Sequence, residues 1–200
     1  DLCGIPWRVA FALQADGWWL RSDVIWQNPC VHPESVRDRP VGEHEYFFLL
    51  ARSRRYLYDA DAISEETSQE DQRRRVRERD AGKLDRVFLR RNKRTVWKVA
   101  HERKDEQDLA QTATFPSDLV APCVLAGAPP GGVVLDPFCG RGTSGRVALR
   151  LGRRYVGIDA NPQSAELARR SCVLGLEEVG RATADDAAAV ARVVQLGLFG

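Results

Sequence analysis

Apolar residues recur along the chain with two different periods, and these periods predict its helices and strands. Between positions 4 and 14 they return every three or four residues, which predicts an amphipathic helix. The stretch RSDVIW that follows predicts a strand that ends before Pro29. A second predicted strand, residues 46–50, is apolar at almost every position. Such continuous apolarity is typical of a strand buried on both faces, within a parallel or mixed sheet covered by helices.

The C-terminal half alternates strands and helices in the order of a parallel sheet. VVLD predicts a strand, and a glycine-rich loop and a helix over residues 144–151 follow it. YVGID predicts the next strand, and a further helix begins at Pro162. This is a βαβ unit, and TVWKVA predicts one more short strand before it. The expected fold class is therefore α/β, in a chain of 200 residues that is long enough for one such domain with a small insertion.

Composition excludes several classes of protein. Hydrophobic residues make up 44% and charged residues 29%, as in ordinary globular proteins, and no window of 18 apolar residues predicts a membrane span. There is also no basic and apolar leader of the secretory type. The five cysteines are scattered without a C-x-x-C pair, which predicts free thiols rather than disulfides or a metal site. We therefore expect a cytoplasmic protein.

The glycine-rich loop LDPFCGRGTSG predicts a site for a nucleotide-like cofactor. Gly140, Gly142 and Gly145 match the G-x-G-x-x-G pattern of dinucleotide sites, where a pyrophosphate lies at a helix N-terminus. Here, however, Asp136 stands at the end of the strand, and its carboxylate would repel a pyrophosphate and attract a cation. S-adenosylmethionine has no phosphate and carries an ammonium and a sulfonium group. It is therefore favoured over NAD or FAD, and over an empty Rossmann-like scaffold.

A second carboxylate, Asp159, ends the next predicted strand, 23 residues after Asp136. A carboxylate at that place can accept hydrogen bonds from both hydroxyls of a ribose. Both NAD and S-adenosylmethionine offer that ribose, so Asp159 does not decide between them. The alternative is that Asp159 only caps the helix that begins at Pro162.

Four stretches resemble, in the same order, the DNA N4-cytosine/N6-adenine methyltransferases with the beta-type motif order. They are GIPWRVAFALQADGWWLRSDVIWQNP, ESVRDRPVGEHEYFFLLARS, ATFPSDLVAPCVLAG and VVLDPFCGRGTSGRVALRLGRRYVGIDANP. The resemblance implies a Rossmann-like, S-adenosylmethionine-dependent methyltransferase fold, circularly permuted, with a mixed and mostly parallel sheet. In this order the catalytic half comes first, a target-recognition segment follows, and the cofactor half comes last. The late position of the glycine-rich loop is then explained.

The resemblance also implies a set of cofactor-binding residues. One group would close over the methionine part of the cofactor, another would surround it or begin the next helix, and the last would hold the ribose and adenine. In that order the residues are Phe115, Pro116 and Leu119; Asp136, Phe138, Gly140, Gly142 and Thr143; and Asp159 and Asn161. For Phe115 and Pro116 an ordinary turn is the alternative. Cys139 is interpreted as a small loop residue, because methylation of an amine needs no cysteine nucleophile.

The catalytic signature of the resembled family is absent from this sequence. That signature is Asp, Ser or Asn followed by Pro-Pro and an aromatic residue, where the aromatic ring stacks on a flipped base. The one Pro-Pro pair, Pro129-Pro130, follows Ala128 and precedes Gly131. The chain also has no methionine and begins with Asp1. We therefore expect a fragment that lacks the N-terminal catalytic motif, contains no catalytic residue and does not methylate by itself.

Arginine-rich sequence predicts contact with double-stranded DNA. Residues 73–98 contain 12 Lys or Arg against 3 Asp or Glu, in a chain of net charge +2, and occupy the family's target-recognition position. The predicted DNA-binding residues are Arg39, His44, Arg90, Arg91 and Arg94. The alternatives are a solvated helix of mixed charge for this segment and, for the whole chain, an inactive DNA-binding remnant of a bacterial or phage enzyme.

The C-terminal sequence QLGLFG resembles the short peptides by which bacterial replication proteins bind the sliding clamp. A polar Gln195 would be followed by Leu198 and Phe199, which could enter adjacent apolar pockets. The alternative is a C-terminal turn that packs on the domain. The predicted division is thus 1–65 (end of the catalytic half), 66–112 (basic target-recognition segment), 113–180 (cofactor-binding half) and 181–200 (C-terminal tail).

Overall fold

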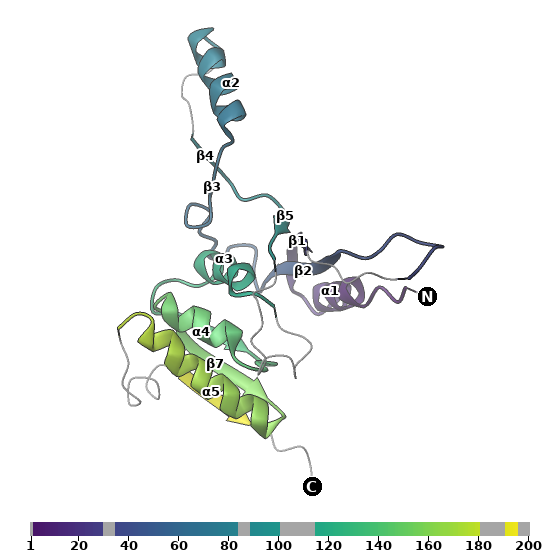
Figure 1. The fold of residues 1–200 in the computed structure, drawn as a ribbon, viewed down its shortest axis with the longest axis vertical. Helices are drawn as coiled ribbons and strands as arrows, with labels where there is room; N and C mark the ends of the chain where they lie inside the picture. Colours follow the sequence, from purple (N-terminus) through teal and green to yellow (C-terminus); the bar gives the residue numbers. More distant parts are fainter. Residues whose placement is uncertain (1, 30–34, 84–88, 101–114, 181–190, 196–200) are drawn as a thin grey trace.

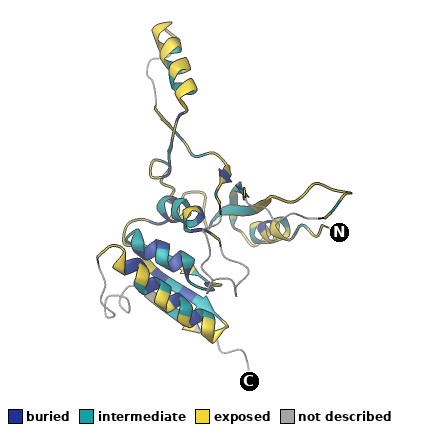
Figure 2. Ribbon diagram, viewed as in Figure 1, coloured by how far each residue is buried: buried dark blue, intermediate teal, exposed yellow. Residues whose placement is uncertain are grey.

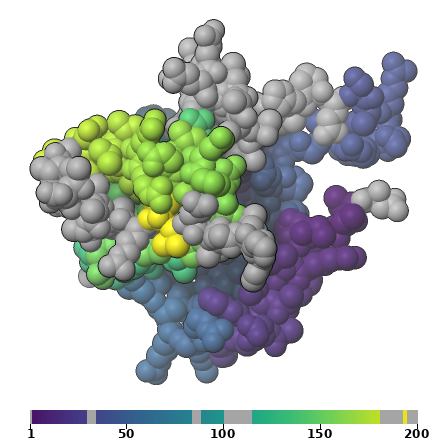
Figure 3. Space-filling view, turned by 90° about the horizontal axis from the view of Figure 1, so that it is seen from below, coloured from purple at the N-terminus to yellow at the C-terminus, as the bar shows by residue number. Residues whose placement is uncertain are grey.

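The computed structural model describes residues 2–29, 35–83, 89–100, 115–180 and 191–195 (Figure 1). It consists of an N-terminal sheet with one helix, a C-terminal α/β unit, and a long arm that projects from the body. Figure 3 shows the division from below, where the N-terminal segment and the C-terminal half form separate masses on one face. No helix in the described ranges is long and apolar enough to cross a membrane.

The N-terminal sheet has the strand order β2-β1-β5. Strand β1 (Trp19–Gln27) is antiparallel to β2 (His44–Ala51) and parallel to β5 (Val96–Lys98). Helix α1 (Ile5–Ala15) packs on this sheet through the Trp7 ring, which lies 4.9 Å from the Phe48 ring. The predicted strands at RSDVIW, 46–50 and TVWKVA, and the first predicted helix, are confirmed.

The two faces of β2 explain its continuous apolarity. Phe48 points toward α1, while the neighbouring Phe47 contacts Trp97 of β5, with ring centroids 5.1 Å apart. Most side chains of β2 are half-buried rather than buried, however, so the prediction of full burial on both faces is corrected. The strand lies at an edge of its sheet in the described part of the chain, which leaves its side chains partly accessible.

The C-terminal unit is a parallel sheet of order β6-β7-β8 with helices packed against it. Figure 2 shows the buried residues of these helices on their inner sides. Its elements are β6 (Val133–Asp136), α4 (Thr143–Arg150), β7 (Arg154–Asp159), α5 (Pro162–Glu177) and β8 (Ala191–Gln195). The core joins Leu149 of α4, Tyr155 of β7 and Cys172 of α5, each no more than 2% exposed. The predicted βαβ unit and the α/β fold class are confirmed.

Strand β8 lies within residues 181–200, which were set apart above as a tail. It pairs with β7 in parallel, and Gln195 stands opposite Asp159. Residues 191–195 therefore extend the sheet of the C-terminal unit.

Helix α3 (Ser117–Gly127) lies between the N-terminal sheet and helix α4 of the C-terminal unit. It packs on α4, and its Leu119 joins a buried cluster with Trp26 of β1 and Trp97 of β5. The Trp26 indole donates a hydrogen bond to the Val99 carbonyl, at 2.8 Å, which satisfies the polar end of a buried ring. The N-terminal sheet and the C-terminal unit are thus joined through one shared apolar cluster.

The projecting arm contains the basic segment. Strands β3 (Glu65–Glu66) and β4 (Arg90–Arg91) form a short antiparallel pair that carries helix α2 (Gln69–Asp80) at its end (Figure 1). We call β3 and β4 together the stalk.

Candidate functional site

The loop between β6 and α4 turns sharply because two of its glycines adopt a left-handed backbone. Gly140 has φ of 50° and Gly142 has φ of 83°, a region that side chains strongly disfavour. At Gly142 a Cβ atom would also lie 2.7 Å from the Cα atom of Ala168 on α5. The loop can therefore lie against α5 only with glycine at this position, and α4 begins directly after it, at the predicted Thr143.

Asp136 supports the loop from the end of β6. One carboxylate oxygen accepts a hydrogen bond from the Phe138 amide, at 3.0 Å, and the other accepts one from the Ser144 hydroxyl. Ser144 also lies 3.0 Å from the hydroxyl oxygen of Tyr155. Burial raises the pKa of Tyr155 far above its ordinary range, so this phenol stays protonated and can donate to Ser144.

Asp159 holds the same loop from the end of β7. One oxygen accepts a hydrogen bond from the Gly140 amide, at 2.9 Å, and the other accepts one from the Asn161 amide, at 2.8 Å. The side chain that caps α5 is Asn161, which accepts from the Gln163 amide at 2.9 Å. Asp159 is therefore not the cap of this helix, and that alternative is excluded.

Ser144 and Tyr155 are site residues that the sequence analysis missed. Tyr155, Gly157 and Asp159 alternate along β7 and so share one face of the strand. Gly157 leaves room for the Tyr155 ring, because a Cβ atom there would lie 2.8 Å from its Cε1 atom. The period-two pattern of YVGID was the signal that could have placed Tyr155 beneath the loop.

The remaining predicted cofactor residues occupy different environments. Phe138 is 88% exposed at the loop, and Phe115 is 42% exposed before α3. Pro116 is buried at the start of α3, whereas Leu119 belongs to the cluster with Trp26 and Trp97. The role of Leu119 toward the cofactor stays a prediction. Cys139 is buried in the core next to Tyr155, which agrees with its interpretation as a small loop residue.

Two of the predicted DNA-binding arginines have partners inside the arm. The Arg90 side chain donates to the Ser64 hydroxyl, at 2.7 Å, and to the Ser64 carbonyl. Arg91 lies 3.6 Å from both Glu65 and Asp71. Both side chains therefore contribute contacts that stabilise the stalk. Their contribution to DNA binding stays a prediction.

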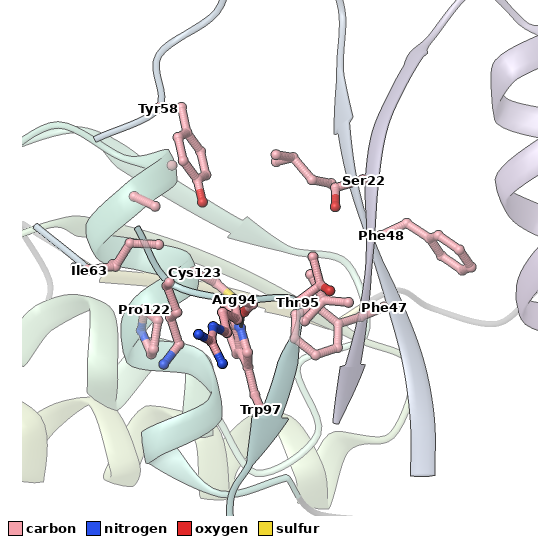
Figure 4. A pocket seen from close by; sticks show the side chains of 15 residues that line it. Ser22, Phe47, Phe48, Tyr58, Ile63, Arg94, Thr95, Trp97, Pro122 and Cys123 are labelled. Carbon is pink, nitrogen blue, oxygen red and sulfur yellow. Dashed lines mark hydrogen bonds between the residues drawn. The ribbon is translucent and has the colours of Figure 1, made fainter. Parts of the chain in front are cut away.

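The other three predicted DNA-binding residues are spread over the N-terminal part. Arg39 is exposed in a loop, and His44 begins β2 with its ring 5.1 Å from that of Tyr46. Arg94 lines a cavity of about 170 Å³ between α3 and the N-terminal sheet (Figure 4). The cavity is mainly apolar, with Phe47 and Trp97 on the sheet side and Ile63 and Cys123 opposite (Figure 4), and no predicted cofactor residue lines it. Its lining residues are separate from those of the glycine loop.

Two further expectations concern the C-terminal peptide and metal binding. Of the proposed clamp-binding peptide, only Gln195 lies inside the described ranges, and it belongs to β8 rather than to a free end. Among the described residues no group of His, Cys, Asp and Glu could hold a metal ion.

Comparison with known proteins gives the family. The family model described as DNA methylase, of the N6/N4 type, matches residues 4–170. The chain is 46% identical over 168 residues to the Type II methyltransferase M.Cfr9I of Citrobacter freundii, a match that covers 84% of this chain and 49% of that protein. It is also 46% identical over 169 residues to M.SmaI of Serratia marcescens, with 84% and 51% covered. The chain thus spans about half the length of these curated relatives.

Solved structures share the fold. The complex of M1.HpyAVI with SAM has a TM-score of 0.62 at 14% identity, over 86% of this chain and 71% of that one. The PvuII DNA methyltransferase, described as cytosine-N4-specific, has a TM-score of 0.61 at 16% identity, over 92% and 60%. The glycine loop with its two carboxylates and the matches along most of the sequence lead to one conclusion: the chain belongs to the N4/N6 DNA methyltransferase family.

Proposed function

We propose that this chain is the cofactor-binding and DNA-recognising part of a bacterial or phage methyltransferase that acts in the cytoplasm. The enzyme transfers a methyl group from S-adenosylmethionine to the exocyclic amine of cytosine (N4) or adenine (N6) in double-stranded DNA. The observation that carries the proposal is the pair of carboxylates, Asp136 and Asp159, which end adjacent parallel strands and hold one glycine loop between them.

The residues present fit this cofactor. Each oxygen of Asp159 accepts one backbone hydrogen bond, and a carboxylate oxygen has a second lone pair for a ribose hydroxyl. Asp136 places negative charge at the loop, which suits a cationic ligand and opposes a pyrophosphate. The left-handed Gly140 leaves its Cβ position open, since no atom lies within 4 Å of it. Phe138, exposed at the same loop, offers an apolar surface to the ligand.

The chemistry divides between the cofactor and the protein. S-adenosylmethionine supplies an electrophilic methyl group on a sulfonium. The exocyclic amine of a base is a weak nucleophile because its lone pair is delocalised into the ring, so the protein must orient it and accept its hydrogen bonds. In this chain the carbonyl of Pro129 already accepts a hydrogen bond from the Gly132 amide, at 2.9 Å, in the turn before β6. The Pro129-Pro130 pair is therefore engaged in a turn, and we propose that the amine-binding residues come from sequence beyond these 200 residues.

A chimaera tests the proposal. This chain replaces the matching 168 residues of M.Cfr9I, and the product is incubated with DNA and S-adenosylmethionine labelled in the methyl group. Digestion to nucleosides should give label in N4-methylcytosine or N6-methyladenine, while the 200-residue chain alone should give none. Label only at carbon 5 of cytosine would refute the proposal. A chimaera that binds DNA but transfers no label, beside an active M.Cfr9I, would favour the inactive DNA-binding remnant.

A further inference from the structure

Helix α2 is held in solvent without packing against a core. None of its residues is buried, and it projects from the body at the end of the stalk (Figures 1 and 2). A helix of this length is marginal by itself, so its local features matter. Ser68 caps it by accepting a hydrogen bond from the Asp71 amide, at 3.1 Å, and acidic residues in the first turn and arginines in the last complement its dipole.

The stalk and the adjoining Thr67 contact one side of this helix. Asp71 lies 3.6 Å from Arg91 of β4, and the Gln72 side chain donates to the Thr67 carbonyl at 2.8 Å. In the stalk itself, the Glu65 carboxylate forms ion pairs with both Arg91 and Lys93, and it lies 3.0 Å from the Lys93 ammonium. The side of α2 that carries Asp71 therefore faces the stalk, and these contacts fix the rotation of the helix about its own axis.

Arg73 and Arg77 lie on the side of α2 away from Asp71, because successive helical residues are about 100° apart. Both are exposed, and neither forms an ion pair within the described ranges. Arg74, by contrast, pairs with Asp71 and Glu78, and Arg79 pairs with Asp80. The outward face of α2, defined by Arg73 and Arg77, thus presents guanidinium groups that no described residue of the arm neutralises.

We infer that the outward face of α2 enters the major groove of double-stranded DNA and that Arg73 and Arg77 read guanine there. The inference rests on the proposed function and names the residues that determine its sequence specificity. An α-helix about 10–12 Å wide fits a major groove about 12 Å wide. Residues four apart are about 6 Å apart along the axis, close to two base-pair steps, and arginine binds the O6 and N7 atoms of guanine bidentately. Glu70, one turn before Arg73, can accept from a cytosine amine on the same groove floor.

Selection from a random pool of DNA duplexes tests the inference on the full 200-residue chain. The unchanged chain should enrich a sequence motif that contains guanines. The variant Arg73→Ala/Arg77→Ala should bind that motif about tenfold or more weakly, the loss expected for bidentate contacts. The matched control, Arg74→Ala/Arg79→Ala, removes two arginines with partners on the helix and should stay within about threefold. Circular dichroism checks that α2 is retained in every variant.

A conservative variant separates recognition of the base from electrostatic attraction to the DNA backbone. Arg73→Lys/Arg77→Lys keeps the charge but loses bidentate geometry, so it should keep the salt dependence of binding and lose one or two guanine positions from the motif. An unchanged motif in this variant, an alanine variant that binds like its control, or no motif for the unchanged chain would each overturn the inference. If this chain selects guanine but the chimaera transfers no methyl group, the inference stands and the proposed function is refuted.

Discussion

At the scale of single residues, the site depends on polar groups that satisfy one another beneath the loop. Tyr155 is 1% exposed and Ser144 is 7% exposed, so each hydroxyl needs a protein partner. The chain of hydrogen bonds runs from Tyr155 through Ser144 to Asp136. It fixes the carboxylate of Asp136 at the place where the loop begins. The orientation of this charge, and not only its presence, is therefore a property of the fold.

Replacement of Ser144 should cost more than replacement of Tyr155, although tyrosine is the larger residue. Ser144→Ala leaves the buried Tyr155 hydroxyl without its partner and should lower the free energy of unfolding by about 1–3 kcal/mol. Tyr155→Phe removes the hydroxyl itself and leaves Ser144 bonded to Asp136, so it should cost about 1 kcal/mol or less. Urea denaturation measures both. A double variant that is clearly less stable than Ser144→Ala alone would contradict this account.

Asp159→Ala should weaken the binding of S-adenosylmethionine by about 1–3 kcal/mol, because it removes a charged hydrogen-bond acceptor. Titration calorimetry of the chimaera gives the affinity. Glu166→Ala is the matched control, since Glu166 is a half-exposed carboxylate on α5 that contacts only Arg169 and Arg170 among the described ion pairs. Equal losses in the two variants would show a general charge effect. Binding of NADH in preference to S-adenosylmethionine would refute the argument from the charge of Asp136.

At the scale of elements, the stalk is a short strand pair held by charges. Burial raises the pKa of Glu65, but the hydrogen bond and charge of Lys93 and the charge of Arg91 outweigh this effect and hold the pKa below its ordinary value. A carboxyl group whose pKa is lower in the folded chain stabilises that fold above the ordinary pKa of about 4.3. The stabilisation is lost as the pH falls through the lowered value.

The stalk should therefore loosen as the pH falls. Hydrogen exchange of the Thr67 amide, which donates to the Leu89 carbonyl at 2.8 Å, reports on the stalk. Its protection, corrected for the intrinsic exchange rate, should fall between pH 5 and pH 3, within about a unit or two of the ordinary glutamate pKa. Glu65→Gln should show low protection at both pH values, whereas Glu66→Gln should behave like the unchanged chain. Constant protection down to pH 3 in the unchanged chain would show that these ion pairs do not hold the stalk.

At the scale of the whole molecule, local patterns predicted more than long-range contacts. The β6–α4–β7 unit and its two carboxylates lie within 30 residues, so strand period, glycines and Pro162 were enough to place them. The partners of Arg90 and Arg91 lie 20 or more residues earlier in the chain, and no local pattern indicates them. Leu119 likewise has the spacing of a helix residue, but only the packing of α3 between the N-terminal sheet and α4 decides which side chains it contacts.

This position of α3 leads to a prediction that separates a cofactor contact from a structural one. Leu119→Ala removes a side chain that is 9% exposed from the cluster with Trp26 and Trp97, and should lower the free energy of unfolding by about 2–5 kcal/mol. Phe115→Ala changes a side chain that is 42% exposed, so its cost in stability should stay below about 1 kcal/mol. If Phe115 closes over the cofactor as the family resemblance implies, only this second variant should lose affinity for S-adenosylmethionine in the temperature range where both are folded. Thermal unfolding and calorimetry on the chimaera measure the two quantities side by side. A Leu119→Ala variant of unchanged stability and reduced cofactor affinity would place Leu119 at the cofactor and refute the assignment to the shared core.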